Sequence, residues 1–217
     1  RTSKMGYHSI IYIFLFLPVC LLAYQLAPEK WRGRVLLGFS WIFFYLLSGK
    51  LLVYLLGTTL LTHCIGIWLT LLKTEEAKAV EGMDRKQKKV IKAEYQKKGR
   101  RVLILGILIL LGVLGYLKYF DFFTTNLSYL FGHPVLEGWR PEKLLMPIGI
   151  SFYTLQAIGY MTDVYWGTIQ AETEIWRTAL FLGFFPQIME GPIARYSDVA
   201  DTLYTGKPLE YRNVVDG

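Results

Sequence analysis

Long apolar segments recur along the 217-residue chain, and they constrain its fold more than any other feature. The first, residues 8–27, contains no Asp, Glu, Lys or Arg. A helix of that length crosses the ~30 Å hydrocarbon layer of a bilayer. Further apolar segments follow at residues 35–48, 51–72, 102–117, 144–162 and 178–193. The sequence therefore predicts an all-α protein, a polytopic transmembrane helical bundle with about five to six membrane segments.

The sixth apolar segment differs from the others because Pro186 and Gly191 interrupt it. Proline removes a backbone donor and breaks a helix. In a membrane, interrupted backbone is tolerated only where protein covers it or where it lines a water-filled cavity. We therefore expect this segment to be short, tilted or re-entrant, with its free backbone groups capped by other parts of the protein.

Positive charge is concentrated between two apolar segments. Residues 73–101 contain eleven Lys and Arg against five Asp and Glu, which is +6 of the net charge of +7. Such a run could bind nucleic acid, but the positive-inside rule favours a cytoplasmic loop and no nucleic-acid partner. Its pattern also allows a basic amphipathic helix on anionic lipid headgroups. With this loop inside, the basic residues 30–34 also fall inside, and residues 121–143, with three acids and two bases, fall outside.

Cysteine and histidine give no sign of a disulfide framework or a metal site. Cys20 and Cys64 lie inside apolar segments, while His8, His63 and His133 are far apart and lack ligand spacing. We interpret each histidine as an interfacial or packing residue. The sequence also lacks a phosphate-binding glycine loop, a nucleophile elbow and an HExxH motif. It therefore predicts no metal ion and no bound cofactor.

Two segments near the carboxyl end are more polar than a plain membrane span requires. The first is residues 146–167, where Pro147 and Gly149 precede the apolar stretch, and the second is residues 184–196. We take their polar residues as candidates for lining a pore or supporting a scaffold. They are Ser151, Gln156 and Asp163 in the first segment and Gln187, Glu190 and Arg195 in the second.

Each of these segments has two interpretations. A carboxylate in the middle of a membrane costs ~2.5–3.5 kcal/mol, so Asp163 in such a position would face protein or a water-filled cavity. Alternatively, Asp163 lies at the cytoplasmic interface, where the cost is small. Glu190 and Arg195 either pair beside the interrupted backbone or belong to an ordinary surface turn.

The string PIGISFYTLQAIGYMTDVYWG, followed by FFPQIMEGPIARY, resembles the membrane-bound O-acyltransferases. It is most similar to their bacterial branch, which includes alginate O-acetyltransferase membrane subunits and the D-alanyl transfer proteins of lipoteichoic acid. The resemblance extends over nearly the whole chain from Tyr7. It implies that residues 5–217 are the amino-terminal part of one funnel-shaped membrane domain, with residues 73–101 as a cytoplasmic basic loop or helix within it.

The resemblance also implies an activity. An acyl group, which we expect to be acetyl, would pass from a thioester donor to a hydroxyl of an exported polysaccharide. The thioester, on coenzyme A or an acyl carrier protein, would be a substrate on the cytoplasmic side of a bacterial cell membrane, and the polymer would lie on the other side. A histidine in the later half of the family's sequences is the implied general base. We expect it downstream of Gly217, so no catalytic residue is assigned here and these residues alone should be inactive.

Other functions stay open at this point. Within the same family, D-alanyl transfer to teichoic acid is the alternative to polysaccharide acetylation. A membrane transporter would also explain an intramembrane carboxylate and interrupted helices. A non-catalytic membrane assembly subunit would need no chemistry. An acyl product, or transport without one, would discriminate between these classes.

Overall fold

The computed structural model describes residues 12–131, 149–190 and 194–208, and within these ranges all regular structure is helical. This confirms the predicted all-α class. A π-helical turn (Tyr12–Phe16) leads into the first helix, and a 3₁₀ turn (Gly49–Leu51) joins the second to the third. The helices are α1 (Leu17–Leu26), α2 (Glu29–Ser48), α3 (Leu52–Ala79), α4 (Arg85–Phe131), α5 (Ile150–Trp166), α6 (Ile175–Gly183), α7 (Phe185–Glu190) and α8 (Tyr196–Tyr204).

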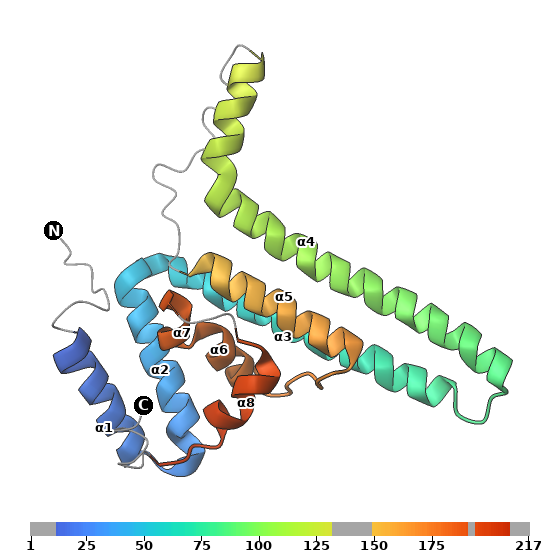
Figure 1. The fold of residues 1–217 in the computed structure, drawn as a ribbon, viewed down its shortest axis with the longest axis horizontal. Coiled ribbons are helices and arrows are strands. Elements are labelled where there is room, and N and C mark those ends of the chain that lie inside the picture. The colour runs from blue at the N-terminus through green and yellow to red at the C-terminus, as the bar shows by residue number, and fades with distance from the viewer. Residues whose placement is uncertain (1–11, 132–148, 191–193, 209–217) are drawn as a thin grey trace.

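Two helical runs are long and apolar enough to cross a membrane, Glu29–Ala79 and Arg85–Tyr119. The first consists of α2 and α3, which meet at a corner where Gly49 has a φ of 56° (Figure 1). The other apolar helices are shorter, since α1, α5 and α6 have 10, 17 and 9 residues. The count of five to six membrane segments therefore stays a prediction.

The basic segment at residues 73–101 forms the tip of a helical hairpin. It is helical to Ala79 on α3, turns, and becomes helical again from Arg85 on α4. The 28 residues of α3 and the 47 of α4 give lengths of about 42 and 70 Å. Both exceed the ~30 Å hydrocarbon layer. The predicted helical character is confirmed, but the segment is shared between two long helices instead of forming a separate one.

The main core lies where α3, α4 and α5 run alongside one another (Figure 1). The three helices approach most closely at Gly106 of α4. A Cβ there would lie 3.1 Å from the Met161 sulfur and 3.3 Å from Cγ1 of Ile65. Small residues at such positions allow helix backbones in a membrane bundle to come together. Of the three glycines in residues 102–117, Gly106 thus serves helix packing, whereas a Cβ at Gly112 or Gly115 would meet nothing within 4 Å.

The carboxyl-terminal helices pack back onto the amino-terminal ones. Both α6 and α7 lie on α2, and Phe185 of α7 joins Phe16 and Phe43 in an aromatic cluster with ring centroids 5.4 to 5.5 Å apart. Beyond α8, the Gly206 carbonyl accepts a hydrogen bond from Nη1 of Arg32 at 2.6 Å. Residues about 170 positions apart therefore close the fold around α2.

Candidate functional site

The two polar segments meet at the residue before α5. Gly149 has a φ of 73°, which side chains rarely adopt. A Cβ at Gly149 would lie 2.1 Å from Cγ2 of Ile188 and 2.9 Å from the Ile188 carbonyl oxygen. Both the backbone conformation and the close approach therefore require glycine. Through this contact the segment 146–167 packs directly against α7 of the segment 184–196.

The interrupted backbone between α6 and α7 is covered by protein. The backbone is extended at Phe184, with ψ of 110°, and a new helix, α7, begins at Phe185. The Phe185 N–H donates to Oγ of Ser40 on α2 at 3.3 Å. The Ser40 hydroxyl in turn donates to the Leu36 carbonyl at 2.7 Å, and its side chain is fully buried. Thus α2 supplies the cap that an interrupted segment at membrane depth needs.

The three candidate residues on α5 do not converge on one point. At the start of the helix, Oγ of Ser151 accepts a hydrogen bond from Nζ of Lys118 on α4 at 3.2 Å. Gln156 is buried near the middle, 3% exposed. Asp163 is half-buried in the last turn, where its carbonyl accepts the N–H groups of Gly167 and Thr168, each at 3.0 Å. Twelve positions along a helix correspond to about 18 Å, so these residues line α5 along its length.

The candidates on the second segment are Gln187, Glu190 and Arg195. Gln187 is half-buried on α7, and Arg195 is exposed immediately before α8. The Glu190 side chain lies outside the described residues. The pairing of Glu190 with Arg195 therefore stays a prediction.

A polar cluster that the sequence did not indicate joins the end of α5 to α3 and α6. The Tyr160 hydroxyl accepts a hydrogen bond from the Glu172 N–H at 2.8 Å and is also bonded to Thr178. Thr178 Oγ1 lies 3.2 Å from Nδ1 of His63, in the apolar part of α3. These contacts connect residues up to 115 positions apart. No local spacing could have predicted them.

Glu172, in the connection between α5 and α6, is the centre of this cluster. Its Oε1 accepts a hydrogen bond from the Tyr196 hydroxyl on α8, and its Oε2 lies 3.5 Å from Nη1 of Arg177. The Tyr204 hydroxyl donates to the Arg177 carbonyl at 2.7 Å. We call the cluster of Tyr160, Glu172, Arg177, Tyr196 and Tyr204 the Glu172 joint. A carboxylate that is this fully partnered is held in one orientation.

Two tyrosines of the Glu172 joint, Tyr196 and Tyr204, have raised pKa values. Burial raises the pKa of the Tyr196 hydroxyl, and its hydrogen bond to Glu172 raises it further. Burial likewise raises the pKa of Tyr204. Both lie on α8, outside the two membrane-length runs. At neutral pH each hydroxyl keeps its proton and serves as a hydrogen-bond donor.

His63 and Thr178 are as close together as a general base and a nucleophile would be, but both are buried, so a substrate has no access to them. Thr178 is 0% exposed and His63 9% exposed. A substrate could not reach the threonine oxygen without unpacking α3 from α6. This agrees with the interpretation of His63 as a packing residue. Within the described ranges, no group of three or more His, Cys, Asp or Glu is placed to hold a metal ion.

The helical architecture, the membrane-length apolar runs and the covered interruption between α6 and α7 define a helical membrane protein. Comparison with known proteins makes this class more specific. Over 91% of its length, the chain is 32% identical to a probable alginate O-acetylase of Pseudomonas aeruginosa and to one of Pseudomonas putida. Over its whole length, it is 26% identical to a peptidoglycan O-acetyltransferase of Helicobacter pylori.

These relatives confirm the resemblance to the bacterial alginate O-acetyltransferase branch of the membrane-bound O-acyltransferases. The chain spans 34%, 36% and 42% of the lengths of the three proteins, in the order given. No family model matches the chain, and no solved structure matches it.

Proposed function

We propose that this chain is part of a membrane enzyme that transfers an acetyl group to a hydroxyl of an exported polysaccharide. One observation carries the proposal: similarity to alginate O-acetylases extends over 91% of the chain, and a peptidoglycan O-acetyltransferase is also similar. The two kinds of relative differ in polymer but share the acetyl group and a carbohydrate acceptor. The shared chemistry is therefore the part that transfers best to this chain.

In the reaction that we propose, an acceptor hydroxyl oxygen attacks the carbonyl carbon of an acetyl thioester. The new C–O ester bond forms, the C–S bond breaks, and the sulfur leaves as a thiolate. The hydroxyl proton passes to a general base, for which histidine has a suitable pKa. We propose, as the family resemblance implies, that this histidine lies downstream of Gly217; among the described residues, His63 is not a candidate because it is enclosed between α3 and α6.

The described helices would then hold the reacting part of the enzyme in place. The contact between Gly149 and Ile188 fixes the two motif segments against each other, and Ser40 seals the interruption between α6 and α7. In this view, Ser151, Gln156 and Asp163 support the wall formed by α5 and do not take part in the chemistry. A support of this kind affects activity through the positions of other groups.

The thioester donor, on coenzyme A or a carrier protein, would approach from the cytoplasmic side, and the polymer from the opposite side of a multi-pass bacterial cell-membrane protein. Contacts between basic or connecting segments support this assignment. Lys73, near the end of α3, donates to the Val164 carbonyl near the end of α5 at 2.8 Å. The Glu172 joint connects the segment after α5 to α8 through Tyr196. Arg32 on α2 donates a hydrogen bond to the carbonyl of Gly206, shortly after α8. The segments that the positive-inside rule places inside are thus connected to one another.

The test uses the complete protein that contains this chain, reconstituted in vesicles with radiolabelled acetyl-coenzyme A and alginate or peptidoglycan. The proposal predicts label on the polymer that mild alkali releases as acetate. In a parallel reaction with a labelled D-alanyl carrier protein and teichoic acid, label transferred there and none transferred from acetyl-coenzyme A would contradict it. So would solute transport without any labelled polymer. Turnover by residues 1–217 alone, above a heat-treated control, would show that the general base does not lie downstream.

A further inference from the structure

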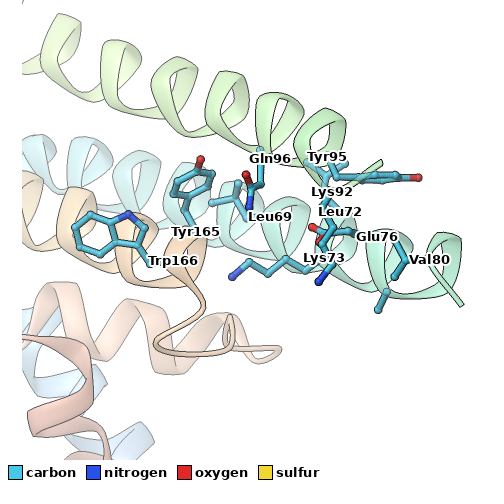
Figure 2. Close-up of a pocket in the computed structure, with 12 residues that line it drawn as sticks. Leu69, Leu72, Lys73, Glu76, Val80, Lys92, Tyr95, Gln96, Tyr165 and Trp166 are labelled. Atoms are coloured by element: carbon cyan, nitrogen blue, oxygen red, sulfur yellow. The ribbon is translucent and has the colours of Figure 1, made fainter. Parts of the chain in front are cut away.

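A cavity of about 730 Å³ opens between the ends of α3, α4 and α5. We call it the hairpin cavity; it lies between 69–80 of α3, 92–99 of α4 and 165–166 of α5 (Figure 2). Its volume is within the range of roughly 300–1,000 Å³ typical of small-molecule sites. It does not include the Glu172 joint or the contact between α5 and α7. It is therefore separate from the elements described above.

One end of the hairpin cavity is closely packed and mainly apolar, with Gln96 as a polar neighbour (Figure 2). Leu69 of α3, Gly99 of α4 and Tyr165 of α5 meet there. A Cβ at Gly99 would lie 3.3 Å from the Tyr165 ring and 3.9 Å from Cδ2 of Leu69. Leu72 continues the apolar wall along α3, and Trp166 is 71% exposed beside it. An acyl chain would find hydrocarbon contact along this wall.

The other end of the hairpin cavity is cationic and open. Lys92 and Glu76 line this end, whereas the Lys73 ammonium group extends toward the end of α5; the three residues together leave one excess positive charge. One N–H of the Lys73 ammonium group donates to the Val164 carbonyl at 2.8 Å, so two donors are left. Lys92 is exposed on α4. Figure 2 shows Lys92 and Glu76 nearer the hairpin tip than Tyr165 and Trp166.

This change from apolar to cationic coincides with the end of an apolar segment. Lys73 is the first charged residue after residues 51–72. Aromatic side chains such as Trp166 are enriched where a membrane meets water. A ligand in this cavity would thus have its tail at the level of the hydrocarbon and its headgroup at the level of the lipid phosphates.

We propose that the hairpin cavity binds an anionic glycerophospholipid. The phosphate accepts hydrogen bonds from Lys73 and Lys92, and one acyl chain lies against Leu69, Leu72 and Trp166. The apolar wall and the depth favour a lipid over a soluble phosphate ester, and the excess positive charge favours an anionic headgroup over a zwitterionic one. The site does not depend on acyl transfer and would be present in a protein of another function.

The experiment measures lipid binding to the complete protein in detergent by native mass spectrometry. The probes are dioleoylphosphatidylglycerol and dioleoylphosphatidylcholine. Each basic residue near an anionic headgroup contributes about fivefold in affinity, so Lys92→Gln should weaken phosphatidylglycerol binding about fivefold and phosphatidylcholine binding less. The matched control is Lys97→Gln, which removes the same charge from an exposed position of α4 outside the cavity and should change binding less than twofold.

A second variant tests the apolar wall. Trp166→Ala should weaken both lipids by similar factors, because it removes hydrocarbon contact and no charge. Equal effects of Lys92→Gln and Lys97→Gln would overturn the proposal, since they would indicate attraction to the whole basic tip. Displacement of phosphatidylglycerol by equimolar glycerol 3-phosphate would also overturn it and would assign the cavity to a soluble phosphate ester.

Discussion

The charge of Glu172 is paired within the chain at the Glu172 joint, whereas the charges at the tip of the α3–α4 hairpin are exposed. Glu172, with a side chain 17% exposed, has its backbone N–H and both carboxylate oxygens partnered within the chain. At the tip, the pair of Lys98 and Glu94 is 3.1 Å apart, but the two side chains are 49% and 63% exposed. Exposed helix pairs of this kind contribute little to stability, because solvent screens them. The Glu172 carboxylate is thus satisfied within the chain, whereas the charges of the tip face the surroundings of the protein.

The comparison predicts that substitutions matter most where the chain's own elements meet. The largest effect is expected at Gly149, between the two motif segments. Gly149→Ala combines a strained left-handed backbone with a clash against Ile188, about 2–5 kcal/mol together. The midpoint of thermal unfolding in detergent should fall sharply. Gly159→Ala is the matched control, because a Cβ at this exposed position of α5 meets nothing within 4 Å; similar losses in both variants would contradict the contact.

A smaller effect is expected within the Glu172 joint. Tyr196→Phe keeps the ring in its aromatic cluster but removes the hydroxyl that donates to Glu172. A partly buried carboxylate that loses a donor costs about 1–3 kcal/mol. Chemical unfolding should show this loss. Tyr119→Phe, at a residue 45% exposed, should be neutral; if the two variants are alike, the joint does not stabilise the fold.

The same hydroxyl gives the joint a pH dependence. Since burial raises the pKa of Tyr196 above its usual value of about 10, the resulting stability is present below pH 10 and is lost as the pH rises further. Tyr196→Phe lacks this contribution. The stability difference between wild type and Tyr196→Phe should therefore be constant from pH 8 to 9.5 and narrow above pH 10. A difference that widens with pH would show that the sign is wrong.

The smallest effect is expected at the hairpin tip. Val90 is 70% exposed on α4, so Val90→Gln removes little buried apolar contact. It should change the free energy of unfolding by less than about 0.5 kcal/mol. Unfolding of the complete protein in detergent measures this. A loss above about 1 kcal/mol would mean that the tip is packed against protein and would remove the contrast with the joint.

Apolar length and charge predicted the helices well because both act locally. The apolar stretches at residues 51–72 and 102–117 became parts of α3 and α4, and Gly106 packs helices together as such a glycine should. The basic segment was harder, since its Lys and Glu residues suit a loop as well as a helix. In the structure α3 continues into it as far as Ala79 and α4 begins in it at Arg85.

The joint could not be predicted, because its members have no spacing in common. Glu172 stands in a polar connection where a carboxylate normally faces water, and its partner Tyr196 lies 24 positions further along the chain. Nor did the sequence show that Ser40 caps the interruption at Phe185, 145 positions away. Conversely, the polar residues of α5 were easy to single out, but a helix spreads Ser151 and Asp163 about 18 Å apart. Their polarity alone could not show that these residues lie far apart along α5.

We propose that the Glu172 joint and the hairpin tip lie together on the cytoplasmic side, where the thioester would be used. The most direct test of this proposal is thiol labelling of the complete protein in intact cells, in a background with alanine at Cys20 and Cys64. Single cysteines at Lys88 on the tip and Ser197 on α8 should react with an impermeant reagent only after permeabilisation. A cysteine at the exposed Lys50, in the turn between α2 and α3, should react at once. Labelling of Lys88→Cys or Ser197→Cys in intact cells, with Lys50→Cys protected, would contradict the claim.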